Sequence, residues 1–365
     1  MSSNIILHKK DKIAKGTIQL TGSKSECNRA LVIEALSNGR VKVENLSDAA
    51  DTVTLAGILN SKVVSQNSKT LAIASDKFEI ENPTSEINIG PAGTAMRFLT
   101  AYFTIQEGMV ILTGSERMKQ RPIGLLVDAL RTLGAHITYE EKDGFPPIKL
   151  KGGFEQLTRN ISIKGDISSQ YITALLLIAA RLPLGLELHI EGDLTSRPYV
   201  EMTLAMLKQA GIQHNWQGNV ITIEHQEFSE TSLPVEPDWS AASYWYAIAA
   251  LSDEAELFLP GLTSYSLQGD SVITEIMANF GITSQFKDGG VYLTKEPKPI
   301  YRKIFDMKEC PDLAQTVVVV CAALGHEATF TGLETLKIKE TDRIAALQNE
   351  LAKMGVKLIE KGQVY

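Results

Sequence analysis

Five corners of this chain place glycine, serine or acidic residues at the start of a predicted helix, where they could bind anionic groups. Each corner follows a strand-like segment and precedes an apolar run. Free backbone N–H groups at a helix N-terminus, together with the positive end of the helix dipole, attract anions. Five such corners predict a protein that handles several anionic groups at once. The corners are GSKSECNRA, GPAGTAMRF, GDISSQYIT, EPDWSAASY and KECPDLAQT.

The first corner carries two cationic side chains. Lys24 lies at the predicted helix start, beside a possible capping box of Ser23 and Glu26. A cation at a helix N-terminus opposes the dipole, so we expect Lys24 to have a ligand, although a solvated first-turn lysine is the plainer interpretation. Arg29 follows Ser25 by four residues, so both side chains can face the same ligand. Taken alone, Arg29 is equally well interpreted as a surface arginine.

Gly93 and Arg121 offer two further ways to meet an anion. Gly93 leaves room for close backbone approach, or it is a simple turn glycine. Arg121 precedes Pro122, which favours an extended backbone at the arginine. A guanidinium group can bind a carboxylate or a phosphate through two parallel hydrogen bonds.

The third corner presents hydroxyl and amide groups before an apolar helix. Ser168, Ser169 and Gln170 follow Gly165 and Asp166. Hydroxyl groups and free backbone N–H groups suit a phosphate. Plain N-capping by a serine is the simpler interpretation, and both can hold together.

Acidic residues that could transfer protons occur near the end of the chain. Asp312 opens a helix with an apolar continuation, and burial there would raise its pKa and favour a general base. The helix dipole would lower the pKa instead. Lys339, Glu340 and Arg343 are three and four residues apart, so we expect them to share one helix face. A solvated face held by salt bridges is the alternative.

The elements that must position these residues recur with a period of roughly 70 to 77 residues, which is longer than a solenoid unit and fits one βαβαββ block. Each block is predicted to contribute one apolar inner helix and one amphipathic outer helix to a core. In the last four segments, the glycine at the end precedes a predicted strand start, as in LGAHI and MGVKL. The segments end at Asn60, Gly134, Gly211, Gly281 and Gly355, and the inner helices are predicted at 30–36, 171–180, 241–251 and 313–324.

Composition narrows the class of protein. With 365 residues, 44% of them hydrophobic and 22% charged, the chain is predicted to be globular and long enough for two domains. The net charge of -7 argues against general nucleic-acid binding, so an anionic substrate must be met by a local basic cluster. Cys27, Cys310 and Cys321 have no paired spacing, which argues for a reducing compartment and against disulfides or zinc. The six histidines show no metal spacing, and no signal peptide or membrane span is predicted.

In their order along the chain, these motifs resemble the signatures of the 5-enolpyruvylshikimate-3-phosphate (EPSP) synthase family. The resemblance covers nearly the whole chain, and GTAMR, RMKQRPI and KETDR are together highly specific, although any one of them alone would be weak. The matching residues are Gly22 to Ser25, Asn28 to Leu31, Gly93 to Arg97, Arg117 to Ile123, Ser168 to Gln170, Ser196 to Tyr199, Pro311 with Asp312, and Lys339 to Arg343.

The resemblance implies an α/β (α+β) class and the two-lobed enolpyruvyl transferase fold, built from repeated βαβαββ units around inner helices. Carried over to this chain, residues 1–20 and 237–365 form a discontinuous lobe, and residues 21–236 form a continuous lobe of three repeats. The family has six units, of which this chain shows five. The family's last unit, with an Asp-His-Arg-Met-Ala-Met stretch and a later lysine, has no counterpart here.

The resemblance also implies an activity. The family transfers the enolpyruvyl group of phosphoenolpyruvate to the 5-hydroxyl of shikimate-3-phosphate and releases phosphate, by addition and then elimination. By resemblance Asp312 is the base, Glu340 the proton donor and Lys24 a group that contacts both substrates, without a cofactor or metal. We expect a cytoplasmic monomer. The substrate-binding residues implied are Lys24, Ser25, Arg29, Gly93, Arg121, Ser168, Ser169, Gln170, Ser196, Asp312, Lys339 and Arg343.

Two alternatives remain at this stage. The enolpyruvyl transferase that acts on UDP-N-acetylglucosamine shares the fold, but its family carries a cysteine in the loop where this chain has RMKQRPI. The other alternative is a catalytically impaired fragment that binds only shikimate-3-phosphate, because the missing unit would supply an arginine and a lysine for phosphoenolpyruvate. On that basis we expect the 365-residue chain to be nearly inactive and less stable than a chain with six units.

Overall fold

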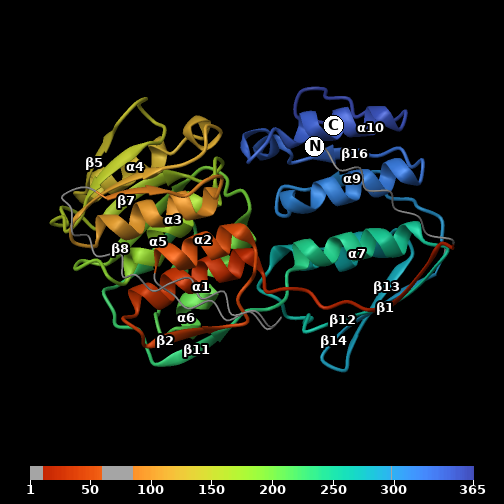
Figure 1. The fold of residues 1–365 in the computed structure, drawn as a ribbon, viewed down its shortest axis with the longest axis horizontal. Helices are drawn as coiled ribbons and strands as arrows, with labels where there is room; N and C mark the ends of the chain where they lie inside the picture. The colour runs from red at the N-terminus through yellow and green to blue at the C-terminus, as the bar shows by residue number, and fades with distance from the viewer. Residues whose placement is uncertain (1–10, 60–84, 297) are drawn as a thin grey trace.

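The computed structural model describes residues 11–59, 85–296 and 298–365. Figure 1 shows two lobes side by side, with helices α1 to α6 in one and α7 to α10 in the other. The end of the first repeat at Asn60 and the first ten residues of the predicted discontinuous lobe lie outside the described residues.

Three four-stranded sheets share one strand order, which confirms the predicted repeat. In each sheet the first two strands are parallel and the remaining neighbours are antiparallel, as a βαβαββ unit requires. The sheets are β3(Ser85–Asn88)-β4(Met109–Thr113)-β6(Ile148–Lys151)-β5(His136–Tyr139), β7(Asn160–Lys164)-β8(Leu186–Glu191)-β10(Val220–Ile223)-β9(Asn215–Gln217) and β1(Ile13–Thr17)-β12(Glu254–Pro260)-β14(Gly290–Lys295)-β13(Ile282–Lys287).

The chain crosses between the lobes twice. Strand β1 pairs with β12 of the second lobe, whereas β11 (Thr231–Pro234) returns to pair with β2 (Val41–Glu44) of the first. The two crossings run side by side: Ser23 N donates to Glu236 O over 2.8 Å, and Asp238 N donates to Thr21 O over 3.0 Å. This pairing brings the first corner, which follows β1, next to the corner that opens α7.

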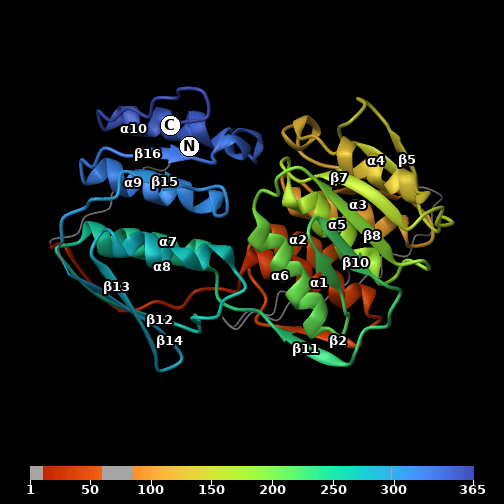
Figure 2. The same cartoon turned by 180° about the vertical axis from the view of Figure 1, so that it is seen from behind.

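Inner and outer helices alternate as the repeat predicts. In the first lobe, the inner helices α1 (Lys24–Leu36), α3 (Gly93–Thr104) and α5 (Ser169–Ala179) contact one another. The apolar residues of α5 are buried, because helices and sheets surround it. Figure 2 shows this group of helices from behind. The outer helices are α2 (Ala50–Ile58), α4 (Gly124–Leu133) and α6 (Arg197–Gln209).

The second lobe departs from the prediction that its inner helices are buried on all sides. Helices α7 (Trp239–Leu251) and α9 (Ala314–Ala323) contact each other and α7 contacts α8 (Ile273–Ala278), but Tyr244 is 57% and Ile248 44% exposed. On α9, Val319 is also exposed. The expectation fails for these faces because, among the described residues, no element covers them.

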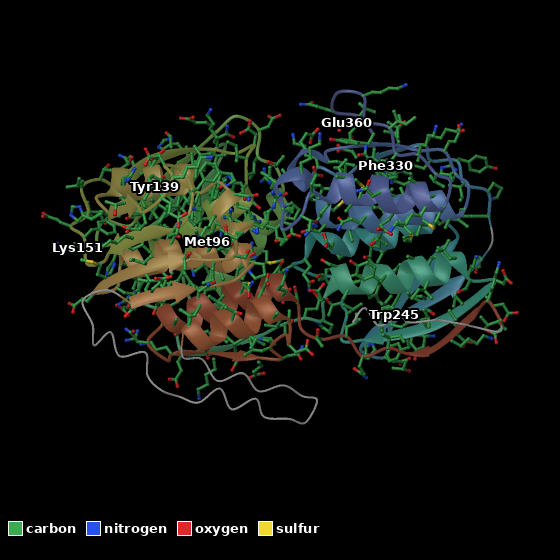
Figure 3. All side chains as sticks on the ribbon, turned by 45° about the horizontal axis from the view of Figure 1, so that its top comes forward. Met96, Tyr139, Lys151, Trp245, Phe330 and Glu360 are labelled. Atoms are coloured by element: carbon green, nitrogen blue, oxygen red, sulfur yellow. The ribbon has the colours of Figure 1, made fainter. Side chains whose placement is uncertain are left out.

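The buried side chains form two separate clusters. One runs from Cys27 to Val235, and the other contains Ala14 and the buried residues from Trp239 to Tyr365. In Figure 3, Met96 lies in the first lobe and Phe330 in the second; both are buried. These clusters support the division near residues 20 and 237, which stays a prediction.

The last repeat differs from the others. The strand predicted after Gly355 is absent from the structure, so that expectation is wrong; residues 356–360 are irregular. The local sheet has only β15 (Ile304–Asp306) and β16 (Thr329–Thr331), and Phe330 pairs instead with Tyr365 through two backbone hydrogen bonds. Helix α10 (Arg343–Lys353) precedes this segment, and short 3-10 turns complete the fold at η1 (Met118–Gln120), η2 (Gly269–Val272), η3 (Pro311–Leu313) and η4 (Glu334–Ile338).

Candidate active site

A pocket of about 270 Å³ is lined by both lobes. It gathers residues from all five predicted corners, with Thr94 and Arg97 as the contribution of GPAGTAMRF. Every predicted site residue except Gly93 lines it: Lys24, Ser25, Arg29, Arg121, Ser168, Ser169, Gln170, Ser196, Asp312, Lys339, Glu340 and Arg343.

Lys24 begins α1, and its local structure explains why a cation is tolerated there. Its backbone N–H donates to Asp238 Oδ2 over 3.1 Å, and its Nζ lies 3.3 Å from Asp51 Oδ2. Only half of the predicted capping box forms: Ser23 Oγ accepts from Glu26 N, but Ser23 N donates to Glu236 O instead of to Glu26. Glu26 instead accepts from the Glu236 N–H, because the second crossing strand lies beside the helix start.

Arg29 is a buried residue, so its interpretation as a surface arginine is wrong. Its Nε donates to Thr203 Oγ1 over 2.8 Å and its Nη1 to Ser25 O over 2.7 Å. Burial lowers the pKa of Arg29 to about 10, which leaves the guanidinium charged at neutral pH. A rigidly held cation at the pocket wall can attract an anionic ligand without losing side-chain freedom on binding.

Gly93 and Arg121 lie in contact, and the missing side chain of the glycine makes room for the guanidinium group. A Cβ atom built on Gly93 would lie 2.1 Å from Arg121 Nη1, so the glycine leaves room for this guanidinium. The extended backbone predicted for Arg121 before Pro122 is confirmed, with φ −92° and ψ 123°. Arg121 is 5% exposed, and its Nη1 donates to Glu340 Oε1 over 3.3 Å. The second corner therefore supplies space, and the residue that follows η1 supplies the cation.

The start of α5 is a capped helix terminus that faces the pocket. Ser168 Oγ accepts from Gln170 N over 3.3 Å, so the N-cap interpretation is confirmed. Gln170 Nε2 donates to Thr94 Oγ1 over 3.1 Å, which joins this corner to the second one. Ser196 has left-handed backbone angles, φ 55° and ψ 42°, and its hydroxyl makes no capping bond to α6.

The spacing of KETDR predicted that its side chains share one helix face, and this prediction is wrong. The segment is a loop between η4 and α10. Asp342 caps α10 by accepting from Ala345 N, so the helix begins only at Arg343. The three side chains nevertheless converge. Arg343 donates to Glu340 Oε2 over 3.0 Å and to Asp312 Oδ1 over 2.8 Å, and Lys339 Nζ lies 3.5 Å from Asp312 Oδ1.

The pKa of Asp312 is lowered in the structure, whereas the apolar continuation of its helix had suggested that burial would raise it. Burial raises the pKa of this carboxyl group, but the charges of Lys339 and Arg343 and the hydroxyl of Tyr199 outweigh it and hold the pKa well below the usual range. Tyr199 OH donates to Asp312 Oδ2 over 3.0 Å. Asp312 is therefore ionised, as a base must be, and its proton affinity depends on these cations.

Glu340 is likewise ionised. Burial raises its pKa, but a hydrogen bond to its own backbone and the charges of Arg121, Arg343 and Lys339 lower it to about 2. Both carboxylates thus share cations that an anionic ligand would also attract. A ligand that takes over Arg121 would raise the proton affinity of Glu340.

Sequence reasoning missed several lining residues. Asp238 and Ser240 belong to the corner EPDWSAASY, which was recognised as an anion site without assigned residues. Arg97 was quoted only as part of GTAMR; it is buried and donates to Gly93 O over 3.0 Å. Nothing in the sequence indicated that the pocket reaches Arg97, because this depends on the tertiary structure.

Cys27, Cys310 and Cys321 are free and buried, as predicted. Within the described parts of the chain, no group of three or more histidine, cysteine or acidic side chains could hold a metal ion. No described helix is both long and apolar enough to cross a membrane.

Comparison with known proteins decides the family. The family model described as EPSP synthase (3-phosphoshikimate 1-carboxyvinyltransferase) matches residues 8–364. The chain belongs to the EPSP synthase family. This confirms the resemblance, which had depended on the order of the motifs GTAMR, RMKQRPI and KETDR.

Named relatives and solved structures agree with this family. A 3-phosphoshikimate 1-carboxyvinyltransferase of Bacteroides fragilis is 45% identical over 349 residues, which cover 95% of this chain and 80% of the relative. One of Pectobacterium carotovorum is 36% identical over 364 residues, covering 97% and 83%. The structure of an EPSP synthase from Acinetobacter baumannii matches with a TM-score of 0.67 at 21% identity, covering 96% of this chain and 81% of that one.

These matches confirm the two-lobed α/β fold, and they favour neither of the two alternatives. The relatives reported above carry the name 3-phosphoshikimate 1-carboxyvinyltransferase and not that of a UDP-N-acetylglucosamine transferase. The assignments of individual site residues stay predictions.

Proposed function

We infer that this chain transfers the enolpyruvyl group of phosphoenolpyruvate to the 5-hydroxyl of shikimate-3-phosphate and releases phosphate. The observation that carries the inference is the pocket between the lobes. There Arg121 and Arg343 share Glu340, and Lys339 and Arg343 share Asp312. Both substrates carry phosphate and carboxylate groups, so a pocket of cations and hydroxyl groups matches their charge.

The proposed reaction needs a base and an acid. In the addition step, the 5-oxygen bonds to C2 of phosphoenolpyruvate, its proton leaves to a base, and C3 gains a proton and becomes a methyl group. In the elimination step, the C2–O bond to phosphate breaks and the methyl group loses a proton. We assign Asp312 as the base, since Lys339 and Arg343 keep it ionised, and Glu340 as the acid.

Glu340 can act as the acid only if its pKa rises, because Arg121, Arg343 and Lys339 lower that pKa in the free protein. In this proposal the binding of phosphoenolpyruvate raises it. The anion binds Arg121 and Arg343, which weakens their attraction for the Glu340 carboxylate. Glu340 can then take up a proton and deliver it to C3. Lys24 begins α1, where its ammonium group pairs with Asp51 of α2, and in this proposal it contacts both substrates.

The phosphate of shikimate-3-phosphate is assigned to the capped start of α5. Ser168, Ser169 and Gln170 line the pocket there, and Ser196 faces it with a hydroxyl free of capping. Arg29 and Ser25 support this end. We also propose that the protein is a cytoplasmic monomer. No cofactor is assigned to the reaction.

Arg121→Lys should raise the KM for phosphoenolpyruvate by about tenfold, while the KM for shikimate-3-phosphate changes much less. Lysine keeps the charge but lacks the planar guanidinium group that binds an anion through two parallel hydrogen bonds. The loss of this paired geometry costs a few kcal/mol of binding free energy at most. Steady-state kinetics with each substrate varied in turn measures this. Arg159→Lys, on a surface ion pair with Glu224, is the matched control. Equal effects on both substrates would contradict the assignment of Arg121.

Gly93→Ala should also weaken phosphoenolpyruvate binding, through Arg121. The new methyl group would lie where Arg121 Nη1 now is, and the flexible arginine would move aside at a stability cost of about 1 kcal/mol. A double-mutant cycle with Arg121→Lys measures the coupling of the two sites. We expect the two effects on the KM to be far from additive, since both act on one guanidinium. Additive effects would show that Gly93 acts in another way.

The acceptor is tested by comparing two compounds at enzyme concentrations equal to those of substrate, so that slow turnover is seen. Phosphate release from phosphoenolpyruvate should require shikimate-3-phosphate and should not occur with UDP-N-acetylglucosamine. Release with the nucleotide sugar and not with shikimate-3-phosphate would contradict the proposed function.

A further inference from the structure

Asp270 is a buried acid that the proposed mechanism does not use. It lies in η2 behind the pocket wall and is 2% exposed. A hydrogen bond joins its Oδ2 to Oγ of Ser240, and Ser240 lines the pocket beside Asp238 and Asp312. Asp270 Oδ1 has no hydrogen-bond partner among the described residues. A carboxyl group in this setting needs an explanation, because burying an unpaired carboxylate is costly.

The charges that face Asp270 favour its neutral form. Burial raises its pKa to about 7; the carboxylates of Asp312 in η3 and Asp238 at the start of α7 act in the same direction, whereas Ser240 and Lys339 act against it. Burial raises the pKa values of Tyr199 and Cys310, and the charge of Asp270 adds to both shifts. Two neighbouring buried carboxyl groups resist double ionisation, and the cations beside Asp312 place the negative charge there.

We propose that Asp270 is a positioning residue whose carboxyl group sets the direction of the Ser240 hydroxyl, and so decides whether the pocket offers its ligand a donor or an acceptor there. An ionised carboxylate only accepts, so Ser240 must donate to it and turn its lone pairs to the pocket. A neutral carboxyl group donates to Ser240 Oγ instead. The serine proton is then free for an anionic ligand.

The proposal links ligand binding to a proton. Shikimate-3-phosphate is anionic, so it should prefer the state in which Ser240 donates and Asp270 is neutral. Binding to the protein with ionised Asp270 then draws a proton onto that group. This role rests on the proposed function, because it takes shikimate-3-phosphate as the ligand of this pocket.

Calorimetric titration of shikimate-3-phosphate into the full chain tests the proposal. Between about pH 6 and about pH 8, on either side of the raised pKa, the wild-type affinity should fall about tenfold more than that of Asp270→Asn. The asparagine stays neutral and can donate to Ser240 at both pH values. Titration in two buffers of different ionisation enthalpy should show extra proton uptake by the wild type alone. The substrate phosphate titrates equally with both proteins, so it cancels in the comparison.

Ser240→Ala separates hydroxyl direction from simple charge repulsion. If the hydroxyl carries the effect, the extra pH dependence should vanish in this variant, although Asp270 still ionises. Retention of the wild-type pH dependence by Ser240→Ala or by folded Asp270→Asn would overturn the proposal. If Asp270→Asn does not fold, as judged by thermal unfolding, Ser240→Ala decides alone. Failure of the wild type to bind shikimate-3-phosphate at any pH would instead overturn the proposed function, and the role of Asp270 with it.

Discussion

Replacing Asp312 with asparagine should lower kcat by about 10²- to 10⁴-fold, which is the usual contribution of a positioned general base. Asparagine keeps the shape, and its one amide oxygen can still accept from Arg343 while its NH2 group faces the Tyr199 hydroxyl, but it cannot take up the proton of the 5-hydroxyl. Because the contacts of Arg343 and Lys339 survive in part, the KM values should change far less than kcat. Steady-state kinetics with both substrates varied checks this.

Two controls distinguish loss of the base from loss of structure. Asp128→Asn, on the solvent face of α4 where Asp128 pairs with Arg131, should leave kcat unchanged. Thermal unfolding should show that Asp312→Asn is folded at the assay temperature. A kcat within about threefold of the wild type would contradict the base assignment, since so small a change is only about 0.6 kcal/mol.

Replacing Glu340 with glutamine should also lower kcat by about 10²- to 10⁴-fold, because the proton donor to C3 is lost. Binding of phosphoenolpyruvate should behave in the opposite way. In the free protein Glu340 occupies Arg121 and Arg343. Glutamine has no charge to compete with the ligand, so the dissociation constant for phosphoenolpyruvate should stay equal or fall.

This separation of turnover from binding is the useful signature. Calorimetry with phosphoenolpyruvate measures affinity, and single-turnover kinetics measures the chemical step. Glu334→Gln, which removes an exposed carboxylate from η4 of the same segment, is the matched control and should alter neither. Weaker phosphoenolpyruvate binding by Glu340→Gln with an unchanged chemical step would assign Glu340 to substrate binding and not to proton transfer.

The parts of the site that depend on local sequence were predictable. Pro122 fixes the extended backbone of Arg121, and the serine before α5 caps that helix as its residue type indicates. The repeated units also followed from the sequence, because their helix and strand periods recur with their glycine corners. The order of the motifs was sufficient for the family.

The parts that depend on distant residues were not predictable. The pKa of Asp312 is governed by Lys339 and Arg343, which follow it by 27 and 31 residues, and Glu340 meets Arg121 from across the two lobes. The spacing of KETDR fitted a helix, but the cap formed by Asp342 moved the helix start to Arg343. Asp270 carries no local signal, since its proposed role depends on the packing of η2 against α7.

The same kind of reason explains the wrong prediction for α7 and α9. An apolar helix surface indicates burial only if a neighbouring element is available to cover it. In the part of the chain that the structure describes, the face with Tyr244 and Ile248 has no such cover. Sequence periodicity shows what a helix can bury, whereas the tertiary structure determines what it does bury.

The most direct test of the central claim is the reaction in D₂O, followed by proton and phosphorus NMR. The chain, phosphoenolpyruvate and shikimate-3-phosphate should yield inorganic phosphate and an enolpyruvyl ether at the 5-oxygen, with deuterium in the vinyl methylene group. Deuterium is expected because C3 passes through a methyl group that gains one proton from the solvent-exchanged acid and loses another. The absence of the ether, or an ether whose methylene group contains no deuterium, would contradict transfer by addition and elimination in this pocket.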